Sequence, residues 1–240
     1  MRFCVKSNQN ITSQCQDKSI FHLVLTTEEQ PLNYQAGDWL TIQASNQTEW
    51  VDEILEQLSL TGDELIELRR VGSVSCREAL THQLEISQLN PAIFNKLQRQ
   101  HQIGSWSDRQ AMMDEAYGLD ILDLLNRFPE LKKWGIEFLL LLAPLGPRYY
   151  SIASSPIAVG SEVHLVVKQV EYCNSTSSKR VHHGVASTAI SLLKVGDEIE
   201  GELKFNPTFK LPEDSATPHY YDWCGNRHCA FYWFFTATFC

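Results

Sequence analysis

The pattern of apolar residues changes twice along the chain, and this order of patterns constrains the fold more than any other feature. Residues 20–44 alternate apolar and polar side chains, which predicts paired antiparallel strands. From residue 50 to about residue 143, apolar residues recur mainly at helical spacing. β-Branched strand character returns at residues 163–170, and a further strand is expected after residue 195. Strands interrupted by a run of helices predict an α+β fold.

Local signals place helix boundaries inside the middle region. Ser75 lies three residues before Glu78, which is the spacing of a helix start, and Asn90 precedes a proline that suits a first helical position. A further apolar helical face runs from Leu119 to Leu125 and is closed by Pro129.

One extended segment, Arg148–Ser155, combines a cation, aromatic rings and hydroxyls. Side chains alternate faces along a strand, so Arg148 and Tyr150 are expected on one face. Tyr149 and Ser151 fall on the other. Arginine binds phosphate oxygens through a fork of N–H groups, and a tyrosine ring offers an apolar face for stacking. The segment predicts a flavin dinucleotide site; the plainer interpretation is a strand followed by a turn of small residues.

A second phosphate contact is expected where Gly184 opens a short helix that runs to about Leu193. Glycine lets the backbone approach a ligand closely, and free N–H groups at a helix start attract an anion. A simple loop-to-helix turn is the alternative interpretation. His182 and His183 precede this glycine, but no carboxylate or cysteine falls at ligand spacing. We therefore expect surface or packing roles for both histidines and no metal site.

Composition excludes several classes of protein. The net charge is -9 and no long basic cluster occurs, which argues against nucleic acid as a partner. The residues after Val5 are polar, so we expect no secretory signal and a cytoplasmic location. Seven cysteines at irregular spacing then indicate reduced thiols. The apolar run at residues 138–143 is far shorter than the ~20 residues that span a bilayer, so it predicts a buried helix end and no membrane segment.

Several motifs together resemble the ferredoxin-NADP reductase superfamily, and within it the diflavin reductases, above all the sulfite reductase flavoproteins. Arg148–Ser151 is similar to the RxYS flavin motif of that family. Tyr34–Asp38 resembles an opening segment of its barrel, and Leu122–Pro129 resembles part of its helical insertion. Gly184–Thr188 is similar to its second phosphate contact. The resemblance follows the family's order over about residues 20–218.

This resemblance implies an antiparallel Greek-key β-barrel from residues 1–48 and 145–217, interrupted by an all-α connecting domain at 49–144. It assigns pyrophosphate binding to Arg148 and isoalloxazine stacking to Tyr150. Ser151 receives the catalytic role, through a hydrogen bond near the ring atom that accepts hydride. The remaining residues of the implied FAD site are Tyr149, Val166, Val167, Lys168, Tyr172, Gly184, Val185, Ala186 and Ser187.

Electron transfer is the function that the resemblance implies. In this family hydride passes from NADPH to FAD, and single electrons pass to FMN and onward to an acceptor. The chain corresponds to the FAD-binding part of this electron-transfer path. FMN is expected on another chain or is absent, and NADPH is bound by the intact proteins of the family. The expected partner is a flavodoxin-like FMN protein or a hemoprotein acceptor. The alternatives are a non-catalytic flavin-binding remnant, a P450 reductase-like protein, or a metal- or membrane-binding protein.

The character of the sequence changes after Pro218. Residues 219–240 are dense in aromatic residues and cysteine, where the resembled family begins its NADP-binding domain with a glycine-rich turn. Reading the same nucleotides one position later forces glycine at Trp223–Cys224 and at Trp233–Phe234, and the other codons permit the family's motif. We therefore expect residues 218–240 to be an out-of-frame tail that truncates the protein. A zinc site or a membrane-surface patch in this tail is the alternative.

Overall fold

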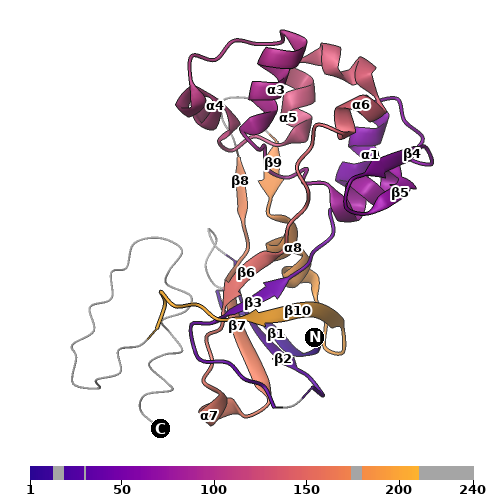
Figure 1. The fold of residues 1–240 in the computed structure, drawn as a ribbon. Helices are drawn as coiled ribbons and strands as arrows, with labels where there is room; N and C mark the ends of the chain where they lie inside the picture. Colours follow the sequence, from indigo (N-terminus) through magenta and orange to yellow (C-terminus); the bar gives the residue numbers. More distant parts are fainter. Residues whose placement is uncertain (13–18, 30, 174–179, 211–240) are drawn as a thin grey trace. The chain divides into compact units, whose positions relative to one another are not determined.

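The computed structural model describes residues 1–12, 19–29, 31–173 and 180–210, which divide into two compact units (Figure 1). The first unit takes in Met1–Ala44, Pro147–Val170 and the segment from Ala186 onward, and the second takes in Ser45–Gly146 and Glu171–Val185. The tail at 219–240, and with it the frameshift hypothesis, lies outside the described residues.

Six strands of the described part of the chain form the sheet of the first unit, in the order β6-β3-β10-β1-β2-β7. Every neighbouring pair in this sheet is antiparallel. The elements of this unit in chain order are β1 Arg2–Asn10, β2 Ile20–Thr26, β3 Trp39–Ile42, β6 Arg148–Ser151, α7 Pro156–Val159, β7 Glu162–Lys168, α8 Val185–Leu192 and β10 Glu198–Lys204.

Alternating burial explains why these segments form a sheet with one apolar face. Phe3 and Val5 of β1 are buried, whereas the residues between and beside them are exposed. In β7 every second residue is likewise buried, and these residues belong to the same apolar cluster: Val163, Leu165 and Val167. The predicted α+β class is confirmed. β1 was not predicted, because its second half, from Ser7 to Asn10, is polar.

The predicted Greek-key barrel is not confirmed, because β6 and β7 remain the two edges of the sheet in the described residues. These edges meet at a single bridge, between Ile152 and Leu165, where the Ala153 N–H also donates to the His164 carbonyl at 2.9 Å. The chain then turns into α7 at Pro156, and proline has no N–H to offer a neighbouring strand. The pairing between β6 and β7 is therefore limited to this one bridge.

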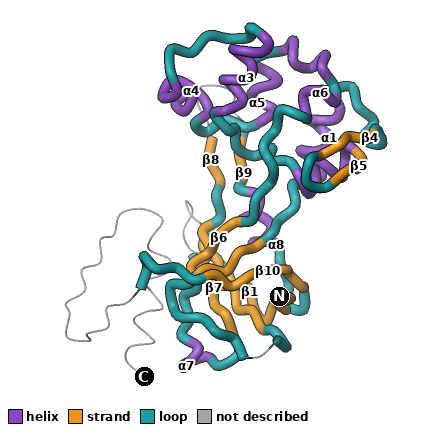
Figure 2. The backbone as a smooth tube through the Cα atoms, viewed as in Figure 1, coloured by secondary structure: helices purple, strands orange, loops and turns teal. Residues whose placement is uncertain are grey.

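The second unit contains most of the helical residues, as Figure 2 shows. Its elements in chain order are α1 Thr48–Gln57, β4 Leu65–Leu68, β5 Gly72–Ser75, α2 Cys76–Glu78, the π-helix η1 Ala79–Gln83, α3 Ala92–His101, α4 Arg109–Ala116, α5 Ile121–Arg127, the 3-10 helix η2 Pro129–Trp134, α6 Ile136–Leu139, β8 Glu171–Cys173 and β9 Val181–His183.

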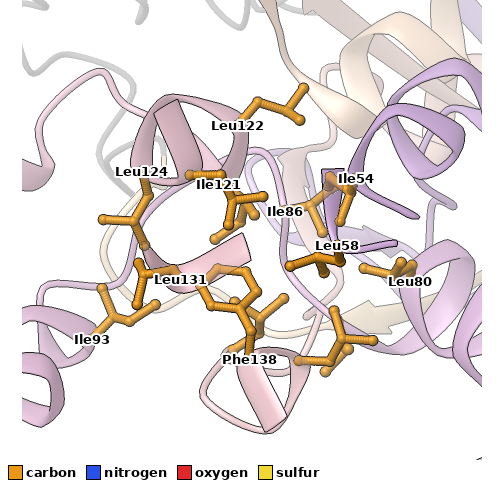
Figure 3. Packing of buried hydrophobic residues seen from close by; sticks show 14 of the residues in the cluster. Ile54, Leu58, Leu80, Ile86, Ile93, Ile121, Leu122, Leu124, Leu131 and Phe138 are labelled. Atoms are coloured by element: carbon orange, nitrogen blue, oxygen red, sulfur yellow. The ribbon is translucent and has the colours of Figure 1, made fainter. Parts of the chain in front are cut away.

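One apolar cluster holds the helices of this unit together. Phe138, Leu124 and Leu131 are fully buried, and Figure 3 shows them beside Ile121 and Leu58. Such close packing of aliphatic and aromatic side chains is the main source of helix stability in a protein, because short helices are marginal in isolation.

The predicted helix start at Ser75 is confirmed, the helix after Asn90 begins one residue later than predicted, at Ala92, and one hairpin was missed. The Ser75 hydroxyl accepts a hydrogen bond from the Glu78 N–H at 3.1 Å, and the Asn90 side chain accepts one from the Ala92 N–H at 2.9 Å. The β4–β5 hairpin interrupts the helical region because Ile66 is buried while Leu65 is exposed, which is the burial period of a strand. Among the described residues, no helix has the length and apolar character needed to cross a bilayer.

Candidate functional site

Strand β6 carries the central residues of the predicted site and alternates as expected. Tyr150 is paired with Leu40 of β3 and packs against the apolar cluster of the sheet. Tyr149 is 51% exposed on the opposite face, where its ring lies 5.5 Å from the ring of Trp39, edge to face. Lys204 of β10 lies over the same Tyr149 ring at 5.8 Å. The strand therefore presents one tyrosine to solvent and holds the other against the core.

The electrostatics of Tyr150 keep its phenol neutral. Burial raises the pKa of Tyr150 to about 12, and the positive charge of Arg148 opposes this shift without cancelling it. Arg148, at the start of the strand, is half-buried. A protonated hydroxyl and a guanidinium thus lie two residues apart, and both can donate hydrogen bonds to an anionic or polar ligand.

The loop Gln35–Asp38 fixes the end of β6, just past Ser151. The Gly37 N–H donates to the Ile152 carbonyl at 2.8 Å, and the Ile152 N–H donates to the Asp38 carbonyl at 2.7 Å. Asp38 is itself buried and accepts hydrogen bonds from the backbone N–H groups of Gln35 and Asn206. The backbone position of Ser151 is therefore constrained by a segment more than one hundred residues earlier in the chain.

The predicted residues of β7 differ sharply in exposure. Val167 is only 2% exposed and points into the core, whereas Val166 is half-buried and Lys168 is exposed. The side chain of Val167 is therefore part of the packing of the sheet. Any contact that Val167 makes with a ligand must use its backbone.

The segment Gly184–Ser187 has the predicted form of a glycine followed by a helix, since α8 begins at Val185. Val185, Ala186 and Ser187 are buried, and the Ser187 hydroxyl accepts a hydrogen bond from the Val170 N–H at 3.1 Å. This hydrogen bond ties the start of the helix to the residues that follow β7. The division between the two units falls between Val185 and Ala186.

Tyr172 lies in the β8–β9 hairpin of the second unit. Its ring stacks on the ring of His182, with centroids 5.0 Å apart and planes only 9° from parallel. Tyr172 also lines a hollow of about 840 Å³ together with residues of the second unit that include Tyr117 and Leu119.

A buried charge cluster in the second unit was not predicted. Asp120 and Asp123, at the start of α5, lie beside Arg180 and His182 of the hairpin. His182 is 2% exposed, so the expected surface role is wrong while a packing role is consistent with its burial. The cluster was missed because the carboxylates lie about sixty residues before the histidine, far outside any ligand spacing that a short motif reveals.

Comparison with known proteins identifies the family of the chain. The FAD binding domain family matches residues 1–189, and the chain belongs to this family. It is similar to the sulfite reductase [NADPH] flavoprotein alpha-components of Vibrio cholerae serotype O1 strain El Tor Inaba N16961 (31% identity over 218 residues), of Aliivibrio fischeri (32% over 217) and of Mannheimia succiniciproducens (33% over 222). These alignments cover 89%, 88% and 88% of this chain, and 35%, 35% and 36% of the relatives. The chain thus spans about a third of the length of the curated relatives it matches, and the predicted family resemblance is confirmed.

The residues present fit FAD. Arg148 is a half-buried cation of the kind that binds pyrophosphate, and β6 carries two tyrosine rings. The start of α8, directly after Gly184, has backbone N–H groups of the kind that bind phosphate. When bound, FAD supplies the hydride and single-electron chemistry that no amino-acid side chain provides.

Proposed function

We propose that this chain is the FAD-binding portion of an NADPH-dependent diflavin-type reductase, similar to the sulfite reductase flavoprotein, in which electrons pass from NADPH through FAD to FMN and an acceptor. The observation that carries the proposal is strand β6, where a half-buried arginine, two tyrosines and a serine occupy one short edge strand. The six-stranded antiparallel sheet then serves as the FAD-binding sheet of the ferredoxin-NADP reductase type.

The roles of the individual residues follow from their chemistry. Arg148 neutralises the pyrophosphate, and Tyr150 provides an apolar face for the isoalloxazine. The Ser151 hydroxyl hydrogen-bonds the reactive edge of the ring, and the backbone hydrogen bonds of its neighbour Ile152 support this role by fixing the end of the strand. Backbone N–H groups of Gly184–Ser187 make the second phosphate contact.

The acceptor is expected to be another protein. The relatives are named alpha-components, which indicates assembly with a second component. We propose a hemoprotein, or a flavodoxin-like FMN protein, as the partner. The chain's net charge of -9 favours a partner with a basic surface.

Arg148→Ala is the direct test of the flavin site. We expect this substitution to raise the FAD dissociation constant about tenfold to a hundredfold, because a charge-assisted hydrogen bond contributes roughly 1.5–3 kcal/mol. The dissociation constant is measured by titrating the purified apoprotein with FAD and following flavin fluorescence. Arg2→Ala is the matched control, since Arg2 forms an exposed ion pair with Glu198 in the same unit, 3.5 Å apart. Equal affinities in the two variants would remove Arg148 from the site.

The purified wild-type protein also distinguishes the reductase from the alternative, a non-catalytic flavin-binding remnant. Bleaching of the flavin absorbance by NADPH supports the reductase. Bleaching by dithionite but not by NADPH supports the remnant. Failure to bind FAD at all overturns both.

A further inference from the structure

The β8–β9 hairpin depends on contacts outside itself. Its strands are three residues each and pair with one another from Glu171↔His183 to Cys173↔Val181. A two-stranded ribbon of this length is not stable alone in water. The hairpin nevertheless carries Tyr172 and leads directly into Gly184. The positions of both proposed flavin contacts therefore depend on the position of the hairpin.

Two buried carboxylates at the start of α5 provide an anchor. Arg180 donates to the Asp120 carboxylate, and its Nη2 lies 3.6 Å from Oδ1 of Asp123. His182 approaches the same pair, with Nδ1 3.2 Å from Asp120 and Nε2 3.4 Å from Asp123. Asp120 and Asp123 are 3% and 4% exposed, so water screens these interactions weakly.

Hydrogen bonds at the start of α5 orient the two carboxylates without any contribution from the hairpin. Asp120 accepts the Asp123 N–H at 3.0 Å, and Asp123 accepts the Asp120 N–H at 3.1 Å, which is a capping box. Each carboxylate therefore has one hydrogen bond that fixes it to the helix. The remaining oxygen of Asp120 points to the guanidinium.

The charge of the cluster depends on Arg180. Burial raises the pKa of Asp120, and the hydrogen bond and charge of Arg180 act against this shift. With both carboxylates ionised, Arg180 leaves one net negative charge; without it, two buried carboxylates face each other. Asp120, Asp123 and His182 offer ligand atoms within 4.8 Å of one another, but the Arg180 guanidinium already supplies a positive charge to the Asp120 carboxylate.

We propose that Arg180 is a positioning residue that fastens the β8–β9 hairpin to the start of α5 through Asp120 and Asp123, and so holds Tyr172 and Gly184 ready for FAD. This inference rests on the proposed function. Arg180 need not touch the flavin. It acts through the hairpin.

A charge-restoring pair of variants tests this role. Arg180→Gln leaves the cluster one unit more negative, and we expect it to raise the FAD dissociation constant at least tenfold at pH 8 and to speed hydrogen exchange of the β9 amides. Adding Asp120→Asn returns the cluster to its original charge while keeping a side-chain oxygen for the helix cap, so the double variant should recover most of both losses. Arg77→Gln is the matched control, because Arg77 pairs with Asp52 on the exposed surface of the same unit at 2.5 Å.

Each outcome of these measurements supports or overturns the proposed role of Arg180. Wild-type affinity and exchange in Arg180→Gln overturn the proposal, and so does a loss that Asp120→Asn leaves unchanged. A rise in melting temperature of the wild-type protein on adding Zn²⁺, abolished by His182→Gln, overturns it in favour of a metal site. If the wild type binds no FAD, the proposed function fails, but hydrogen exchange in the same variants still tests whether Arg180 fastens the hairpin.

Discussion

The glycine in the loop Gln35–Asp38 offers a sharp test of how this fold holds strand β6. Gly37 has φ +87°, a region that residues with a Cβ avoid. A Cβ at this position would also overlap the carbonyl oxygen of Phe209, a backbone atom that cannot rotate away. Gly37→Ala therefore introduces backbone strain and a steric clash together.

A second glycine separates these two effects. Gly196 lies in the same unit with φ +92°, close to that of Gly37, and a Cβ added there would have no described neighbour within 4 Å. Gly196→Ala should therefore show the backbone strain alone, about 1–2 kcal/mol. The clash at Gly37 should add about 1–3 kcal/mol, the usual range for overpacking. We expect Gly37→Ala to destabilise the protein by about 2–5 kcal/mol in total.

Equilibrium unfolding in urea measures both variants, with tryptophan fluorescence as the readout because Trp39 lies in β3 of this unit. Gly37→Ala should also weaken FAD binding, since Gly37 and Asp38 hydrogen-bond the backbone of Ile152, next to Ser151. Gly196→Ala should leave FAD binding unchanged. Losses of unfolding free energy that agree within about 0.5 kcal/mol would refute the reasoning, because the close approach to Phe209 would then have no energetic consequence.

Two further perturbations address the second unit and the Asp38 network. Phe138→Ala should lower the unfolding free energy of the helical unit by about 3–5 kcal/mol, because removing a fully buried ring leaves a cavity. Urea unfolding followed by far-UV circular dichroism measures the loss, and Phe138→Leu should lower the unfolding free energy less. Burial alone would raise the pKa of Asp38, but hydrogen bonds from Lys210 and from the backbone N–H groups of Asn206 and Gln35 outweigh it, so the pKa lies below its ordinary 3.8. The ionised carboxylate therefore stabilises the fold above pH 3.8, and this contribution is lost as the pH falls through the lowered pKa. Asp38→Asn should be less stable than wild type at neutral pH and should show a flatter acid-unfolding curve in that window.

Patterns of neighbouring residues predicted the strands and helix starts that depend on side-chain alternation and on capping. Strands β2 and β3 followed from the alternation over residues 20–44, β7 followed from its β-branched residues, and α2 followed from the spacing of Ser75 and Glu78. The RYYS segment became β6 for the same reason, because its side chains alternate between the core and solvent.

Features set by distant contacts were not predictable in this way. The open edge between β6 and β7 depends on where α7 begins, which a family resemblance does not specify. The pairing of Arg180 with Asp120 joins segments whose separation carries no spacing signal. Each of these is fixed by tertiary packing, which overrides local preference.

The place of β10 in the sheet has a consequence for synthesis. This strand, Glu198–Lys204, pairs with β1 on one side and β3 on the other, so it joins two halves of the sheet that otherwise share no ladder in the described residues. A chain emerging from the ribosome can bring most of the helical unit together once residue 146 is available, whereas the flavin-binding sheet must wait for residue 204. During that interval β1 and β3 have unpaired edges, so the synthesis of β10 is the step that protects these two edges of the nascent protein from association with neighbouring chains.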